Sequence, residues 1–285
     1  MKLISTVAEL QEEIKKSRLQ PVGLVPTMGA LHEGHLSLVA NAINNCPLVV
    51  VSIYVNPTQF NDKQDLKNYP RTIENDLAML KKVLRENDIV FNPADSEVYP
   101  QPDTRVFNFG SLADVMEGLS RPGHFNGVGQ VVSRLFQIVK PDYAFFGQKD
   151  FQQLSIVRDL VRQTRDKVRI IANPTIREPD GLAMSSRNRY LEPEIRKNSG
   201  IIYQTLTSAN EMFNNKDIPE ITSWVIKTIE EVKGFGIEYF EIVDERELIP
   251  VSSKSQMNRK NRYFGCIAVK AGKIRLIDNI EFILA

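Results

Sequence analysis

The chain has 285 residues, of which 42% are hydrophobic and 25% are charged, a composition typical of a soluble globular protein with one large or two modest domains. Its 36 basic and 35 acidic residues leave a net charge of +1, which gives no electrostatic reason to expect nucleic acid or an acidic membrane as a partner. Small molecules are therefore the expected partners. The first twenty residues are rich in charge and no long apolar run follows, so we expect a cytosolic protein without a signal peptide or a membrane span.

Apolar residues alternate between helical and strand spacing along the first two thirds of the chain. After a leading amphipathic helix, β-branched runs at 22–28 and 47–55 predict strands buried on both faces, with a helix between them. The alternation continues through three more helices and three more strands, at 73–84, 88–93, 128–139, 142–147, 151–164 and 168–174. This order predicts an α/β fold with a doubly wound parallel sheet in residues 1–177.

The pattern changes from about Glu178 onward. A polar loop and two helices lead to strand-like runs at 238–244 and 263–278, the second interrupted by a polar hairpin turn at 271–273. Residues 178–285 are therefore predicted to form a second, smaller α+β domain, which we expect to act as a lid.

The segment PTMGALHEGH, residues 26–35, joins the first buried strand to the following helix and contains His32 and His35, two of only three histidines. Open parallel sheets bind their ligands at the carboxyl ends of strands, and the start of a helix attracts anions. Gly29 permits a tight turn, and Gly34 leaves room for a base or a ribose. We expect this segment to bind phosphate, with both imidazoles donating to charge on a leaving pyrophosphate.

The histidine pair has two other interpretations. A zinc-binding helix has the spacing HExxH, which HEGH does not match, and no third ligand is nearby, so a metal site is disfavoured. Capping or filling of a loop remains open from this segment alone. Cys46 and Cys266 lie far apart among apolar neighbours, which predicts buried, reduced thiols instead of a disulfide or a zinc site.

Two later segments end predicted strands with polar side chains. FFGQKD, residues 145–150, brings Lys149, and GLAMSSRNRY, residues 181–190, brings two hydroxyls and Arg187 on a loop after the last strand of the sheet. Each alone is weak, because a single lysine is usually a surface charge. Parallel strands end at one edge of a sheet, however, so we expect both segments to meet the histidines in one crevice.

Together with VVSIYVNPTQF, YPRT, SRPGHFNGV and REPDGLAMSSRNRYL, these segments resemble the pantothenate synthetases, the ligases that join pantoate to β-alanine with ATP. The resemblance is collinear to about residue 191 and continues weakly to RLIDNI near the end. It implies a Rossmann-like amino-terminal domain related to class I aminoacyl-tRNA synthetases and nucleotidylyltransferases. It also implies a homodimer, ATP with Mg²⁺, no tightly bound organic cofactor, and two steps: formation of pantoyl adenylate and pyrophosphate, then attack by β-alanine to give pantothenate and AMP.

The resemblance assigns roles to individual residues of this chain. It implies catalytic roles for His32, His35, Lys149, Ser185 and Arg187. The residues expected to bind ATP are Met28, Gly29, Ala30, Leu31, His32, Glu33, Gly34, His35, Gly147, Gln148, Lys149, Asp150, Ile176, Met184, Ser185, Ser186 and Arg187. Some relatives carry Glu where this chain has Gln148, a difference in local charge only.

The remaining assignments concern the small substrates and the metal. The resemblance points to Gln59 and Gln153 for pantoate and to Gln59 for β-alanine. We expect no dedicated metal site, because Mg²⁺ should arrive with ATP, near Asp76. For His124, in the Gly- and Pro-rich SRPGHFNG loop, packing within the loop and a role near the site or a dimer contact both remain open.

Two rival functions share part of this pattern. A nucleotidylyltransferase uses the same HxGH segment but leaves the nucleotidyl group on its product. A nucleotide sensor or an RNA-binding relative would need no chemistry, but the near-zero charge argues against RNA. The intact set of His, Lys and Ser-Ser-Arg argues against an inactive site.

Overall fold

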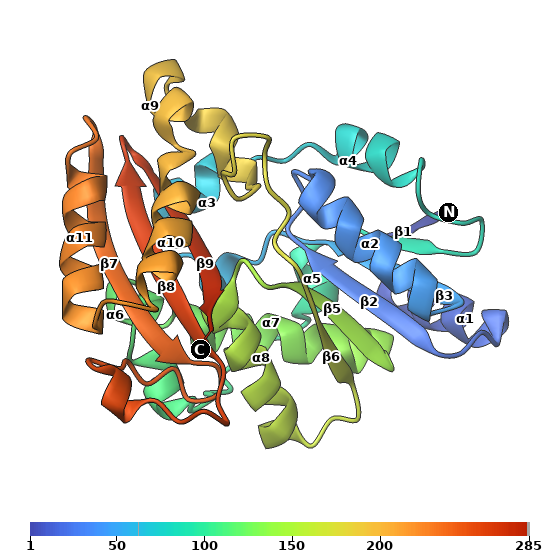
Figure 1. The fold of residues 1–285 in the computed structure, drawn as a ribbon. Helices are drawn as coiled ribbons and strands as arrows, with labels where there is room; N and C mark the ends of the chain where they lie inside the picture. The colour runs from blue at the N-terminus through green and yellow to red at the C-terminus, as the bar shows by residue number, and fades with distance from the viewer. Residues whose placement is uncertain (62, 284–285) are drawn as a thin grey trace.

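The computed structural model describes residues 1–61 and 63–283. The amino-terminal part of the chain forms a larger α/β domain, and the carboxyl-terminal part forms a smaller domain beside it, built on a second sheet (Figure 1). The predicted fold, a Rossmann-like parallel sheet with a smaller α+β domain, is confirmed. The exact boundary between residues 177 and 178 stays a prediction.

Six strands in the described part of the chain form the large sheet in the order β1-β4-β3-β2-β5-β6, and every neighbouring pair is parallel. They are β1 (Lys2–Ile4), β2 (Val22–Thr27), β3 (Leu48–Ile53), β4 (Ile89–Phe91), β5 (Tyr143–Gly147) and β6 (Arg169–Asn173). The strand order reverses direction at β2, which lies between β3 and β5. A crevice is expected at this switch point, outside the carboxyl ends of the strands.

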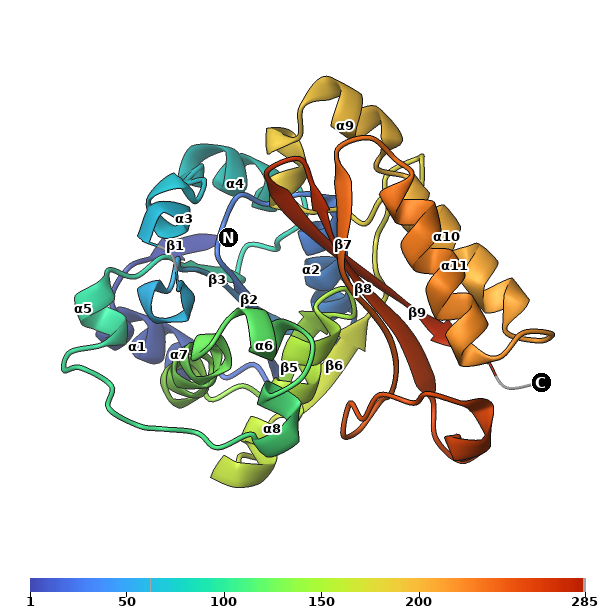
Figure 2. The same cartoon turned by 90° about the vertical axis from the view of Figure 1, so that its left-hand side faces the viewer.

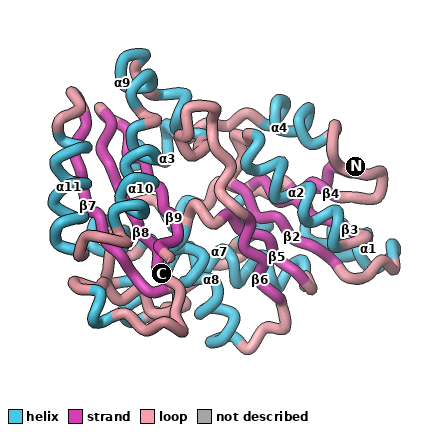
Figure 3. Tube along the Cα trace, in the orientation of Figure 1, coloured by secondary structure: helices cyan, strands magenta, loops and turns pink. Residues whose placement is uncertain are grey.

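Helices cover both faces of the large sheet, as the cyan and magenta tubes of Figure 3 show. One face carries α1 (Val7–Ser17), α7 (His124–Val139) and α8 (Phe151–Thr164), and the other carries α2 (Glu33–Asn45) and α4 (Ile73–Leu80). The connections contain short helices: η1 (Pro57–Gln59), α3 (Lys63–Asn68), α5 (Asp95–Val98), η2 (Gly110–Ala113) and α6 (Glu117–Ser120).

Burial explains why the central elements were predictable. Strand β3 is buried at every position and β2 at all but one, so their sequences are continuous apolar runs and not alternating ones. Helix α8 has the predicted bounds, 151–164. It ends there because Arg165, the next residue, adopts a left-handed conformation with φ of 56°. Strand β1 was missed, since three residues are too few to show a period.

The small domain is an antiparallel sheet of β7 (Phe235–Asp244), β8 (Tyr263–Ala271) and β9 (Ile274–Phe282), with β8 in the middle. Its helical segments are η3 (Ser186–Tyr190), α9 (Pro193–Asn198), α10 (Ile201–Met212), α11 (Ile218–Glu230) and η4 (Lys254–Gln256). Helices α10 and α11 pack on one face of the sheet, and the large domain lies on the other side (Figure 2).

The face of the small sheet that meets the large domain makes both polar and apolar contacts, and its middle strand carries the apolar ones. Phe264 of β8 packs on Phe151 at the start of α8, with ring centroids 4.4 Å apart. Cys266, two residues further along β8, belongs to the same core. Both cysteines are free and buried, as predicted.

Helix α7 approaches the segment that carries Gln59 without a side chain between them. A Cβ atom added to Gly127 would lie 2.3 Å from the Thr58 carbonyl oxygen, far inside a normal contact. The Asn56 amide donates to the Gly127 carbonyl oxygen at 3.2 Å and closes the contact from the other side. Glycine at this position therefore allows η1 to pack directly against the backbone of α7.

Gly127→Ala should lower the free energy of unfolding by about 1–3 kcal/mol, as overpacking does elsewhere, although alanine is the better helix former by about 1 kcal/mol. Gly236→Ala, in β7, is the matched control, because no heavy atom lies within 4 Å of its added Cβ. Urea unfolding of both variants checks this. A Gly127→Ala protein as stable as the wild type would show that η1 can move away freely.

Candidate active site

A cleft of about 240 Å³ opens at the carboxyl edge of the large sheet and reaches the ends of β2 and β5. A larger cleft of about 810 Å³ adjoins it between the two domains. The two clefts share Tyr69, Glu117, Arg121, Lys149 and Arg187 in their walls. The arrangement is typical of a small-molecule site at a topological switch point and a domain interface.

Most of the residues predicted to bind ATP line the first cleft together. They are Met28, His32, Gly34, His35, Gly147, Lys149, Asp150, Ile176, Met184, Ser185, Ser186 and Arg187. Gln59 and Gln153, predicted for pantoate, line the same cleft. Gly29 lines a neighbouring pocket instead, and Ala30, Leu31, Glu33 and Gln148 line neither cleft.

The loop that leaves β2 is held by a buried carboxylate. Gly29 and Ala30 both have positive φ, 78° and 50°, a conformation that costs an alanine about 1–2 kcal/mol. Asp76 of α4 accepts hydrogen bonds from the backbone N–H of Ala30 at 2.9 Å and of Leu31 at 2.8 Å, and Thr72 donates to it at 3.1 Å. Both Asp76 oxygens are thus already bound within the protein, which argues against the expectation that Mg²⁺ lies beside this residue.

The two histidines lie at the start of α2 with their ring centroids 4.1 Å apart. Burial lowers the pKa of His35 to about 3, and burial together with the positive charge of Lys149 lowers the pKa of His32 to about 4. Both rings are therefore neutral near pH 7. The His35 Nδ1 atom accepts from the His32 backbone N–H at 3.3 Å, so the neutral ring carries its proton on Nε2 and can donate to a phosphate oxygen.

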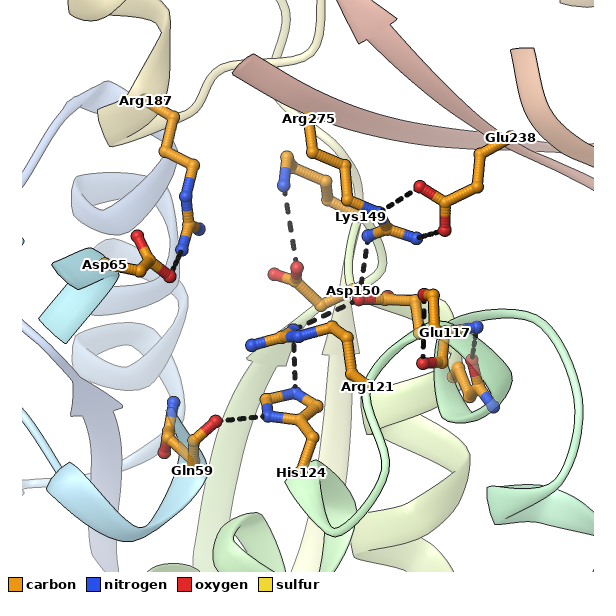
Figure 4. A network of polar contacts seen from close by, with 12 residues as sticks. Gln59, Asp65, Glu117, Arg121, His124, Lys149, Asp150, Arg187, Glu238 and Arg275 are labelled. Atoms are coloured by element: carbon orange, nitrogen blue, oxygen red, sulfur yellow. Dashed lines mark hydrogen bonds and ion pairs between the residues drawn. The ribbon is translucent and has the colours of Figure 1, made fainter. Parts of the chain in front are cut away.

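The Ser-Ser-Arg loop reaches the cleft from the other domain and is anchored on the large one. Arg187 donates to the Asp65 carboxylate at 3.2 Å, and its guanidinium lies 5.9 Å from the centre of the Tyr69 ring. Opposite it, the Lys149 ammonium lies 3.5 Å from Asp150. The positive side chains predicted from the sequence therefore face one another across the cleft (Figure 4).

Gln59 and His124 form one side of the pocket beneath these charges. His124 is 5% exposed, and its Nδ1 donates to the Gln59 carbonyl oxygen at 2.8 Å, which leaves Nε2 to accept from Arg121 at 3.0 Å. Burial lowers the pKa of His124 to about 4, and Arg121 adds to the effect. His124 lines the cleft with both ring nitrogens bound inside the protein (Figure 4), so a role near the site stays a prediction.

Sequence reasoning missed several charged residues at the same place. Glu117 of α6 accepts from Arg121 at 3.3 Å and from Arg275 of β9 at 3.1 Å, and Arg275 also pairs with Glu238 of β7. Arg121 lies in the quoted SRPGHFNG segment, so the resemblance of that segment could have identified Arg121 as a site residue. Glu117 and Glu238 lie in none of the quoted family segments, and Arg275 lies in RLIDNI, where the resemblance is weak. The three side chains meet only in the fold (Figure 4).

One family model covers almost the whole chain. The pantoate-β-alanine ligase model matches residues 2–281. The chain belongs to the pantoate-β-alanine ligase family. The resemblance inferred from the sequence motifs is thereby confirmed, and so is the predicted enzyme class, a pantoate:β-alanine ligase.

Individual members of the ligase family are similar over essentially the full chain. The pantothenate synthetase of Azobacteroides pseudotrichonymphae genomovar. CFP2 is 48% identical over 99% of this chain and 100% of its own. The crystal structure of pantothenate synthetase from Thermus thermophilus is 41% identical, with a TM-score of 0.90 and full coverage of both chains. The ligase from Francisella tularensis, crystallised with β,γ ATP and β-alanine, is 34% identical with a TM-score of 0.79, covering 98% of this chain and 97% of its own.

The pKa values of the three histidines give a stability prediction. An unfolded histidine has a pKa near 6.5, so below that pH the unfolded ligase binds more protons than the folded one, and stability must fall as the pH falls. Between pH 6.5 and 5.5, where carboxylates titrate little, the free energy of unfolding should drop by about 1 kcal/mol per histidine.

Urea unfolding at the two pH values measures this drop directly. His124→Gln removes one titrating ring and should reduce the drop by about a third. An unfolding free energy that stays constant between pH 6.5 and 5.5 would mean that the histidines are accessible to protons in the folded ligase.

Proposed function

We propose that this chain condenses pantoate with β-alanine in two steps, through pantoyl adenylate, and releases pyrophosphate and AMP. The observation that carries the proposal is the meeting of His35, Lys149 and Arg187 in one cleft of a chain whose family match spans residues 2–281. One cleft that concentrates donors and positive charge suits attack on a triphosphate, where charge must be shielded before a carboxylate can approach.

In the first step a pantoate carboxylate oxygen bonds to the α-phosphorus, and the bond from that phosphorus to the β-phosphate bridging oxygen breaks. Pyrophosphate leaves near the start of α2, where the helix amides and the Nε2–H of His35 donate to it. Lys149 and Arg187 neutralise charge on the phosphates. Arg187 donates to Asp65 in this structure, and exchange of that partner for phosphate is proposed to link nucleotide binding to the loop of the small domain.

In the second step the uncharged amine of β-alanine attacks the acyl carbon, the bond from that carbon to AMP breaks, and the amine loses a proton. Gln59 and Gln153 are proposed to hold pantoate, and Gln59 to contact β-alanine. The Gln59 side chain is 8% exposed and is held by Asn56, whose amide donates to it at 3.2 Å. A side chain fixed in this way loses little entropy on binding a substrate.

Mg²⁺ is proposed to arrive with ATP and to neutralise charge on its phosphates. Among residues 1–61 and 63–283, no group of three or more His, Cys, Asp or Glu side chains could hold a metal ion. Mg²⁺ usually keeps several waters and binds through substrate phosphates and one or two carboxylates. Asp150 lines both clefts beside Lys149 and is the carboxylate that we place nearest to it.

A homodimer, which the family resemblance implies, and a cytosolic location remain proposals. Within the part of the chain that the structure describes, no helix is long and apolar enough to cross a membrane. Sedimentation equilibrium of the purified chain distinguishes a dimer from a monomer.

Pyrophosphate exchange tests the proposed function against its rivals. With pantoate, ATP and Mg²⁺ but no β-alanine, labelled pyrophosphate should enter ATP, because the first step is reversible. Adding β-alanine should then release one AMP per pantothenate. A nucleotidylyltransferase would keep the nucleotidyl group on its product, and a nucleotide sensor would do neither. Without pantoate-dependent exchange and without AMP, the proposal fails.

His35→Ala tests the proposed role of His35 as a hydrogen-bond donor to the leaving pyrophosphate. It should slow adenylation about 100-fold or more, as loss of a transition-state donor does, while ATP binding changes much less. Asn45→Ala, an exposed position at the end of α2, is the control and should leave the rate unchanged. Single-turnover measurements of pyrophosphate formation from pantoate and ATP follow this step: a His35→Ala rate near that of the wild type rules out the donor role.

A further inference from the structure

Strand β9 is an edge strand of the small sheet, and three of its polar side chains reach segments outside that sheet. Arg275 bonds to Glu117, Asp278 to Arg177, and Asn279 to the segment that carries Lys149. They fall within RLIDNI, where the family resemblance is weak and gave no residue a role. Of the three, Asn279 makes the most direct contact with a residue proposed to touch ATP.

The Asn279 amide is buried, with 4% of the residue exposed. Its Nδ2 donates to the carbonyl oxygens of both Gln148 and Lys149, each at 3.0 Å. The N–H of Gln148 donates in turn to the carbonyl oxygen of Asn173 on β6 at 2.7 Å. The peptide units beside Lys149 are thus held from the large sheet on one side and from the small domain on the other.

Asp278, the preceding residue, keeps Asn279 in place. Its carboxylate accepts from the Asn279 backbone N–H at 2.8 Å and from two nitrogens of Arg177 at 2.6 and 3.0 Å. Arg177 also donates to the Gly181 carbonyl oxygen at 3.0 Å, at the start of the loop that leads to Ser185 and Arg187. The same short stretch of β9 therefore ties both cleft-lining segments to the small domain.

Lysine needs such support more than a rigid side chain would. Its ammonium is a point charge on a flexible four-carbon stem, and a misplacement of about 1 Å in a catalytic group costs about 100-fold in rate. With the two carbonyl groups fixed, the backbone of Lys149 has one orientation, and its ammonium lies in the cleft beside Asp150.

We propose that Asn279 is a positioning residue for adenylation, which acts through the backbone of Gln148 and Lys149 to hold the Lys149 ammonium against the phosphates of ATP. This inference rests on the proposed function. It also means that the small domain is required for the first chemical step, because β9 supplies the donor.

The test compares Asn279→Asp with the wild type in pantoate-dependent pyrophosphate exchange. A carboxylate of the same shape cannot donate and places negative charge against two carbonyl oxygens, so kcat should fall about 10- to 100-fold with a smaller change in KM for ATP. Asn198→Asp is the matched control, an exposed amide of α9 that donates to one backbone carbonyl, and it should exchange at the wild-type rate.

A double-mutant cycle with Lys149→Ala separates positioning from a purely structural role. If Asn279 acts through Lys149, the Lys149→Ala/Asn279→Asp protein should be no slower than Lys149→Ala alone, because the group being positioned is already gone. Losses that multiply would overturn the inference. Circular dichroism melting checks the fold, and Asn279→Ala replaces Asn279→Asp in the cycle if the charged variant does not fold.

The outcomes separate this inference from the function beneath it. A wild-type protein without exchange overturns both. A wild-type protein that exchanges, together with folded Asn279→Asp and Asn279→Ala proteins that exchange equally fast, overturns the positioning role alone.

Discussion

The strands of the large sheet all run in one direction, and this constraint determines where the candidate site lies. Parallel strands end at a common edge, so the segments after β2, β5 and β6 meet there although they are far apart in the sequence. At the switch point beside β2 the strand order turns from β3 on one side to β5 on the other, and a crevice is expected there. The histidines, Lys149 and Arg187 are neighbours because of topology and not because of sequence.

Buried hydrogen bonds then fix the orientation of the segments that meet at this edge. The Asp76 carboxylate holds the turn after β2 in a conformation that Ala30 would otherwise avoid, and His124 and Asn56 fix Gln59. Asn279 does the same for the segment of Lys149 from across the domain interface. Each contact uses a side chain that is at least nine-tenths buried, where a hydrogen bond to a fixed partner is strong and its loss is costly.

The sequence predicted the elements and the residues that are close in sequence to a strand end. Continuous apolar runs identified β2 and β3, and motif order placed His35, Lys149 and Arg187 at one edge. The sequence could not predict β1, which is too short to show a period. Nor could it predict the hydrogen-bond and ion-pair partners that meet only when the two domains pack together. Asp76 was expected near Mg²⁺ because a carboxylate in sequence alone has no visible partners, and only the fold reveals the two backbone N–H groups that bind it.

The proposed first step is attack of the pantoate carboxylate on the α-phosphorus in this cleft. Pantoate labelled with ¹⁸O in its carboxylate can be followed by mass spectrometry of the products after a complete reaction with ATP and β-alanine. One heavy oxygen is expected in AMP and none in pyrophosphate, because the oxygen that forms the anhydride stays with the nucleotide when the amide bond forms. Unlabelled AMP, or label in pyrophosphate or free phosphate, would contradict it.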